Sequence, residues 1–218
     1  MKTMKQSLQE KTYQLIKQRI QDEVYKANEF IDEAAIAKEL GCSRTPVREA
    51  LIKLSQHNFV KIIPKRGIQV VLCDERSVNY LYEARTVVEP AMVRLYGSQI
   101  PKSELRTLYN TLLIQEKSNS VEETAITLDE PHNIIRQYCT NPYLNDSFDM
   151  VTEQLNRKKV AVGLVAVSGV EHFEDRNLQD HIEIVKRMMD GQFEEAATLL
   201  KCHIEFVHQS LQKYWARK

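Results

Sequence analysis

The sequence predicts a mainly α-helical protein with two domains: a winged helix-turn-helix over residues 1–73 and an all-helical bundle over residues 74–218. Three observations support this fold class. The two segments differ in the sign of their charge; two short helical patterns joined at a glycine precede two β-branched runs; and the remaining two thirds show helical periodicity without strand-like alternation. A chain of 218 residues has enough length for two cores.

The net charge of zero hides an asymmetry between the two segments. Residues 1–73 carry 13 Lys and Arg against 8 Asp and Glu, whereas residues 74–218 carry 17 against 22. The first segment is therefore suited to a polyanionic partner. The four cysteines are scattered, which is typical of reduced thiols in a cytoplasmic protein, and we expect no membrane association because no apolar run reaches the length of a membrane span.

The first segment contains three expected helices and a hairpin. Apolar residues at helical spacing predict a helix from Leu8 to Ala27. A second helix is expected from Glu33 to Leu40 with Asp32 as its N-cap, and Gly41 ends it. Ser43 caps a third helix, whose inward stripe is Val47, Ala50, Leu51 and Leu54. The runs "FVKII" and "IQVVL" then flank a four-residue loop, Pro64 to Gly67, with Lys65 and Arg66 at the tip of the wing.

Arg44, Thr45 and Arg48 fall on the outward face of the third helix. Two cations in a first turn oppose the helix dipole by roughly a few tenths of a kcal/mol each. A helix in the major groove presents its first residues to base edges, where an arginine–guanine contact contributes ~1–3 kcal/mol of discrimination. A solvated arginine face is the alternative, but the complete helix-turn-helix and wing favour DNA binding.

The stretch "LGCSRTPVREALIKLSQHNFVKIIPKRGIQV" resembles the winged-helix domain of the GntR family. The resemblance implies a dimeric transcription factor. It also implies that Ser43, Arg44, Thr45 and Arg48 contact DNA and that Gly67 lies in the wing tip.

The second segment predicts only helices, over residues 75–97, 102–118, 121–139, 143–166, 178–190 and 193–215. Asn141 and Pro142 form an N-cap followed by proline at the first helical position. "EARTVVEPAMVRLY" and "DHIEIVKRMMDGQFEEAATLLKCHI" resemble the FCD effector domain, which is found in the FadR-type branch of the GntR family. That resemblance implies a helical domain that binds a small-molecule effector and dimerises.

His132, His181 and His203 each lie on the inward stripe of a separate expected helix. Each can be a hydrogen-bonded core residue, or the three can converge on a transition metal such as zinc or nickel. The FCD resemblance favours the metal, because it implies three histidines and an aspartate one turn before the first. Leu128 stands at the aspartate position. Asp129 becomes a ligand if Pro131 distorts the helix; otherwise a water or an effector oxygen completes the shell.

Arg85 has two interpretations. The resemblance implies an arginine that faces the ligand cavity and binds a carboxylate, whereas its spacing also fits an ion pair with Glu89.

We therefore expect a ligand-responsive transcriptional repressor that binds a palindromic operator as a homodimer and responds to a small organic acid. Two alternatives are a metal-dependent hydrolytic enzyme and an architectural DNA binder without an effector. We expect no enzyme, because no paired carboxylate with a plausible general-base position accompanies the histidines and hydrolysis leaves the winged helix unexplained.

Overall fold

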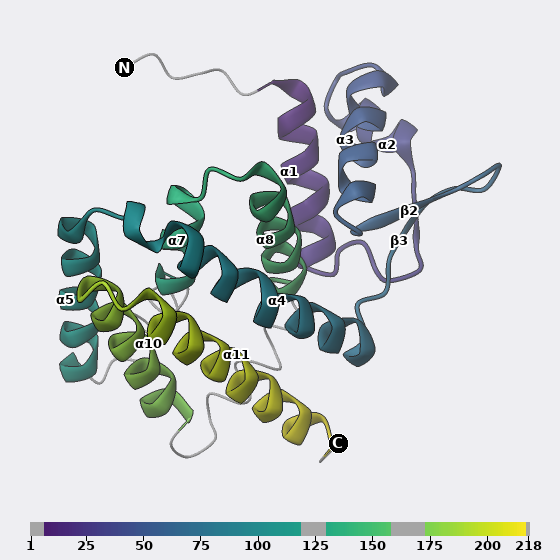
Figure 1. Cartoon of the computed structure of the whole chain (residues 1–218). Coiled ribbons are helices and arrows are strands. Elements are labelled where there is room, and N and C mark those ends of the chain that lie inside the picture. The colour runs from purple at the N-terminus through teal and green to yellow at the C-terminus, as the bar shows by residue number, and fades with distance from the viewer. Residues whose placement is uncertain (1–6, 119–129, 158–172, 217–218) are drawn as a thin grey trace. The chain divides into compact units, whose positions relative to one another are not determined.

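The computed structural model describes residues 7–118, 130–157 and 173–216, which fall into two compact units (Figure 1). The N-terminal unit holds the described residues up to Val78 together with residues 152–157. The C-terminal unit holds the described residues from Asn79 to Val151 and from 173 onward. No helix in the described part of the chain is long and apolar enough to cross a membrane.

The N-terminal unit opens with α1 (Leu8–Gln21), α2 (Glu33–Glu39) and α3 (Arg44–Gln56). Helix α1 ends before the predicted Ala27, because Glu23 adopts a positive φ angle of 59° that a right-handed helix does not allow. The predicted N-cap of α2 is confirmed: Asp32 Oδ1 accepts hydrogen bonds from the backbone N–H groups of the second and third residues after it, at 2.8 and 3.1 Å.

A tight turn at Gly41 joins α2 to α3. Gly41 has φ +61°, and the Cys42 N–H donates to the Ala37 carbonyl at 3.0 Å, which closes the end of α2. Ser43 is the N-cap residue of α3, although its side chain makes no cap hydrogen bond. The predicted inward stripe of α3 is confirmed, since all four of its apolar side chains are fully buried: Val47, Ala50, Leu51 and Leu54. Fully burying a Val or Leu side chain contributes about 1.5–3 kcal/mol, so the stripe fixes the rotation of α3 about its axis.

The predicted hairpin of the wing is confirmed and consists of β2 (Val60–Ile63) and β3 (Gly67–Val70). Its connection is one residue shorter than predicted, because Gly67 pairs with Ile63 as the first residue of β3. Its turn needs Lys65 at φ 63° and Gly67 at φ 114°. A third strand, β1 (Phe30–Ile31), pairs antiparallel with β3 and gives the order β1-β3-β2. Two residues are too few to show an alternating pattern, so the sequence did not indicate β1.

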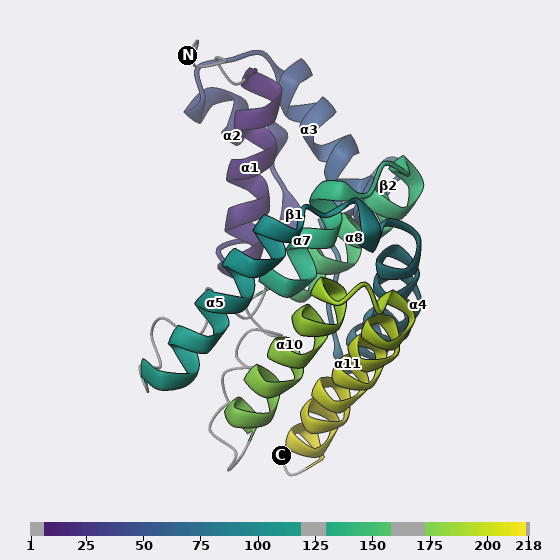
Figure 2. The ribbon, with the colours of Figure 1, turned by 60° about the vertical axis from the view of Figure 1, so that its left-hand side comes forward.

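The C-terminal unit is helical (Figures 1 and 2). Its described helices are α4 (Glu75–Tyr96, whose first turn belongs to the N-terminal unit), α5 (Lys102–Ser118), α7 (Glu130–Tyr138), α8 (Pro142–Leu155, whose last turn also belongs to the N-terminal unit), α10 (Phe173–Met189) and α11 (Phe193–Trp215), with a short 3₁₀ turn at Gly97–Gln99. Helices α10 and α11 lie side by side in both views.

Several predicted helix limits change in this unit. Asn141 caps α8 as predicted, because its Oδ1 accepts from the N–H of Tyr143 at 3.0 Å. Helix α8 ends at Leu155 rather than 166, and α10 begins at Phe173 rather than 178. Beyond the end of α8, the Arg157 guanidinium donates to the Val71 carbonyl at 2.8 Å. The expected helix segments over 121–129 and 158–166 lie outside the described residues.

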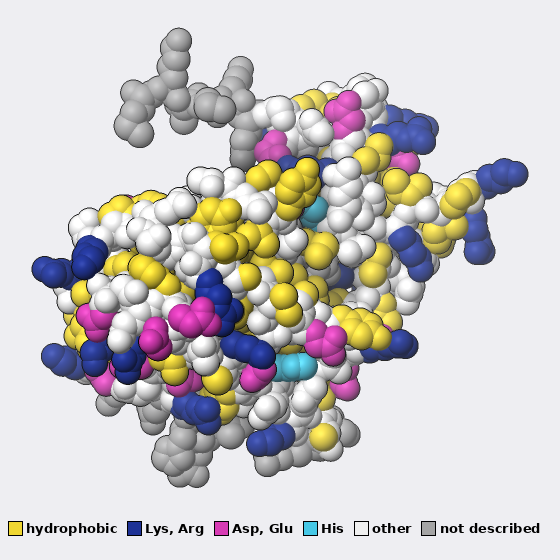
Figure 3. Space-filling view, viewed as in Figure 1, with side chains coloured by type: hydrophobic (Ala, Val, Ile, Leu, Met, Phe, Trp, Pro, Cys, Tyr) yellow, Lys and Arg dark blue, Asp and Glu magenta, His cyan; other side chains and the backbone are white. Residues whose placement is uncertain are grey.

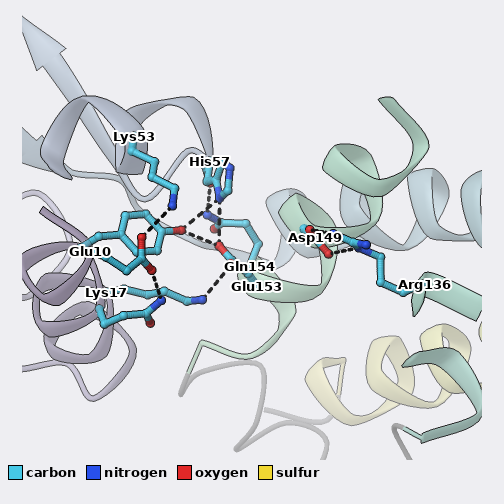
Figure 4. A network of polar contacts seen from close by, with 10 residues as sticks. Glu10, Lys17, Lys53, His57, Arg136, Asp149, Glu153 and Gln154 are labelled. Carbon is cyan, nitrogen blue, oxygen red and sulfur yellow. Dashed lines mark hydrogen bonds and ion pairs between the residues drawn. The ribbon is translucent and has the colours of Figure 1, made fainter. Parts of the chain in front are cut away.

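Glu153, in the last turn of α8, is the centre of a polar network in the N-terminal unit (Figure 4). Its carboxylate accepts from Lys17 Nζ at 2.7 Å and from the Tyr13 hydroxyl at 3.0 Å, and it pairs with His57 Nδ1 at 3.0 Å. Burial alone raises the pKa of this carboxyl, but hydrogen bonds from Lys17, His57 and Tyr13 outweigh burial and lower the pKa. Residues from α1, from the end of α3 and from α8 are thereby joined at one carboxylate.

We expect Glu153→Gln to lower the free energy of unfolding by about 1–3 kcal/mol, because the charged acceptor of a partly buried network is lost. A lowered pKa means that the carboxylate contributes fully above about pH 4.5 and that this contribution is lost as pH falls through its native pKa. The difference between the two proteins in urea or thermal unfolding should therefore shrink below that pH. Glu10→Gln removes a more exposed partner of Lys53 and should change stability by less than about 1 kcal/mol.

Candidate DNA-binding surface and metal centre

The outward face of α3 carries the predicted DNA-binding residues. Ser43, Arg44, Thr45 and Arg48 are all exposed, on the side of the helix opposite its buried stripe. A surface hollow beside α2 is lined by three of them, together with the carboxylate residues Asp32, Glu33 and Glu49. The face is therefore not uniformly basic, and the two arginines lie among groups that repel phosphate.

The wing presents a second basic group. Lys65, Arg66 and Gly67 are exposed at the turn between β2 and β3. Figure 3 shows dark-blue side chains at the protruding end of this hairpin. Within the N-terminal unit the structure thus provides a helix with exposed arginines and a basic loop, the two parts with which a winged helix contacts a duplex.

The three predicted histidines converge in the interior of the C-terminal unit. His132 is supplied by α7, His181 by α10 and His203 by α11, and the side chains are 4%, 1% and 3% exposed. The sequence predicted this placement because each histidine shares a helix face with buried aliphatic residues, such as Ile135, Val185 and Leu200.

The spacing of the three rings suits a metal ion. One nitrogen from each ring lies within 4.8 Å of the nitrogens chosen from the other two, and the Nε2 atoms of His132 and His181 are 3.1 Å apart. Two ligands of a tetrahedral metal at about 2.0–2.1 Å lie roughly 3.3 Å from one another. Three imidazoles at this spacing could therefore hold a zinc ion or a similar transition metal.

The ionisation of the cluster also suits a cation. Burial, followed by the charges of His203, His132 and Arg85, lowers the pKa of His181 well below its ordinary value. Burial also lowers the pKa of His203 to about 4, although a hydrogen bond to Asp180 acts in the opposite direction. Both rings are therefore uncharged near neutral pH, which leaves a lone pair available to a metal.

Two carboxylates hold the outer nitrogens of two of these rings. Glu89, from α4, lies 2.6 Å from Nδ1 of His132, and Asp180, from α10, lies 3.3 Å from Nδ1 of His203. The Nδ1 atom of His181 has no hydrogen-bond partner among the described residues. Neither carboxylate was predicted as part of the site, although Glu89 falls on the apolar stripe of α4 with Tyr82 and Met92.

Arg85 forms the ion pair with Glu89 that its spacing allowed. It also lies near enough to the cluster for its charge to lower the pKa of both His181 and His203. The predicted fourth ligand, Asp129, and its neighbour Leu128 lie outside the described residues.

Residues 8–70 match the family model of the bacterial regulatory proteins of the gntR family, and residues 80–206 match that of the FCD domain. The chain belongs to the GntR family. Its FCD domain is the one found in the FadR-type branch, as the sequence indicated.

Known GntR regulators resemble the chain over much of its length. Over 148 residues, 66% of each chain, it is 27% identical to the uncharacterized HTH-type transcriptional regulator YdhC of Bacillus subtilis. Over 185 residues, 83% of each, it is 25% identical to the Nta operon transcriptional regulator of Aminobacter aminovorans. The structure of Escherichia coli McbR/YncC has the same fold, with a TM-score of 0.68 at 17% identity over 98% of this chain and 99% of that one.

The family membership decides between the alternatives that the sequence left open. This GntR protein is a DNA-binding transcriptional regulator with an FCD domain that binds small-molecule effectors, and it is not an enzyme. The alternative of a metal-dependent hydrolase is therefore rejected. The presence of an FCD domain also gives no support to the alternative of an architectural DNA binder without an effector.

We expect the purified protein to bind one divalent transition-metal ion per chain, because three buried imidazoles offer their lone pairs at ligand spacing. Removal of the ion with a chelator should lower the midpoint of thermal unfolding, since metal binding stabilises the native state. His181→Ala should abolish both effects, whereas His208→Ala, at a half-buried histidine of α11 that stacks on Tyr82, should retain both. The assignment would be contradicted if elemental analysis found no metal and a chelator left the unfolding midpoint unchanged.

Proposed function

We propose that this GntR regulator is a cytoplasmic repressor. In this proposal residues 1–73 bind a palindromic operator, and residues 74–218 bind the effector and hold two chains together. The observation that carries the proposal is the division of α3 into a fully buried stripe and an exposed face with Arg44, Thr45 and Arg48. One face orients the helix, and the other remains available to base edges.

The DNA contacts follow from this geometry. Arg44 and Arg48 lie one turn apart on the exposed face, so both can reach the same stretch of a major groove. Ser43 and Thr45 offer hydroxyls to phosphates at the start of the helix, and Lys65, Arg66 and Gly67 belong to the wing. A single helix reads few base pairs, so useful specificity requires a homodimer on two half-sites.

The effector is proposed to be a small organic acid. Imidazole ligands carry no charge when they bind a metal, so they leave the charge of a divalent zinc or nickel ion uncompensated, and the buried carboxylate of Glu89 is already paired with Arg85. An anionic ligand is favoured in such a place. The carboxylate of the effector, bound by Arg85, would supply the anionic ligand that Leu128 does not, unless Asp129 completes the ligand set.

We expect Arg44→Ala and Arg48→Ala each to weaken binding of the native operator by about 1–3 kcal/mol and to relax the preference for its bases, since each removes one bidentate contact. Fluorescence-anisotropy titrations of the operator and of scrambled DNA would measure both effects. The expected stoichiometry is two chains per palindrome. Lys65→Ala should weaken both DNAs about equally and flatten the salt dependence. Full operator affinity in both arginine variants would refute the assignment of α3.

We expect small organic acids to raise the thermal unfolding midpoint of the metal-loaded protein and to change its operator affinity. The physical reason is that a ligand that binds only the native state stabilises it. A thermal-shift screen of such acids would measure the first effect and operator titration the second. The control is His181→Ala, which should respond to none of them. An acid that stabilises this variant as strongly as the native chain would place the effector elsewhere.

A further inference from the structure

Glu89 is a buried carboxylate in a helical bundle, and its two oxygens have different partners. Oε1 accepts from Nε of Arg85, and Oε2 accepts from Nδ1 of His132 at 2.6 Å. The side chain is only 2% exposed. The ion pair with Arg85 keeps the buried carboxylate ionised, so Glu89 can only accept hydrogen bonds.

The contact with Glu89 decides which nitrogen of His132 carries hydrogen. A neutral imidazole has one N–H group and one lone pair. A carboxylate can only accept, so the hydrogen of His132 lies on Nδ1 and the lone pair lies on Nε2. That Nε2 atom is the one that lies 3.1 Å from Nε2 of His181, inside the cluster. The hydrogen bond to Glu89 therefore leaves the lone pair of His132 on the nitrogen that faces the candidate metal position.

We propose that Glu89 is a positioning residue of the metal centre: it fixes the ring and the tautomer of His132, so that Nε2 is the ligand atom. This inference rests on the proposed metal site. Outer carboxylates of this kind fix the orientation of ligating histidines and make them more basic. Arg85 has a part in the arrangement, because its guanidinium occupies the other oxygen of Glu89 and holds the carboxylate in place.

Asp180 holds His203 in the same sense but less firmly. Its contact with Nδ1 of His203 is 3.3 Å long, and its side chain is 30% exposed. Water can replace a carboxylate in such a position more readily than in the buried position of Glu89. The two carboxylates should therefore differ in their importance for metal binding, and a substitution of Asp180 should weaken it less than a substitution of Glu89.

Glu89→Gln is the decisive substitution because it preserves the shape of the side chain but reverses the direction of its hydrogen bond with His132. Arg85 can only donate, so it takes the single oxygen of the glutamine amide. The amide NH₂ group then faces Nδ1 of His132 and requires a lone pair there. The hydrogen of His132 is driven to Nε2, the atom that should bind the metal.

The test measures zinc affinity of the full-length chain by competition with a chromophoric chelator. Glu89→Gln should lower the affinity by about 10- to 100-fold, the usual effect of losing an outer partner of a ligating histidine. Asp180→Asn should have a smaller effect. Glu83→Gln, the same change at an exposed position of the same helix, should have none. With cobalt in place of zinc, the visible absorption bands of Glu89→Gln should differ from those of the native protein, whereas those of Glu83→Gln should not.

The native half of a second measurement does not depend on any variant folding. In the metal-free native protein, ¹⁵N chemical shifts of His132 should show hydrogen on Nδ1, and in Glu89→Gln they should show hydrogen on Nε2. Hydrogen on Nε2 in the native chain would overturn the inference, as would unchanged zinc affinity in Glu89→Gln. If His181→Ala loses zinc while Glu89→Gln does not, the metal centre stands and only the role of Glu89 fails. If the native chain binds no zinc, both fail together.

Discussion

Burial of one apolar face per helix is the constraint on which both units of this regulator depend. In α3, four side chains without any exposed surface fix the helix, so the opposite face with Arg44 and Arg48 points outward. In α7, α10 and α11 the same periodicity turns a histidine inward. The helical repeat thus delivers charged groups to solvent in one unit and imidazoles to the interior in the other.

An interior imidazole needs a partner, and this requirement organises the bundle core. His132 and His203 have the carboxylates of Glu89 and Asp180 as partners, and Nε2 of His132 lies next to His181 within the cluster. A core built only for stability would be better filled by aliphatic side chains, since a buried charge such as Glu89 costs free energy unless it is fully paired. Three imidazoles, a carboxylate and Arg85 in one core fit the binding centre that we propose.

The fold was largely predictable from periodicity and turn residues, because these are local properties of the chain. Asp32, Gly41 and Asn141 act at the helix ends where the sequence placed them. The errors also have local causes. The positive φ angle of Glu23 ends α1 early at a position where the sequence has no glycine, and β1 is too short for an alternating pattern. Helix α8 ends at Leu155, and the guanidinium of Arg157 beyond it bonds to a carbonyl far away in the sequence, a contact that periodicity does not indicate.

The sequence by itself determined which residues face inward and which face outward, since that follows from the 3.6-residue repeat. It also determined the family, through the stretch around Arg44 to Leu51. Only the tertiary structure decided that three histidines from distant helices meet within ligand distance, that Arg85 pairs with Glu89, and that Glu153 gathers Tyr13, Lys17 and His57. Such contacts depend on how helices cross, and the side-chain packing that sets the crossing involves residues far apart in the chain.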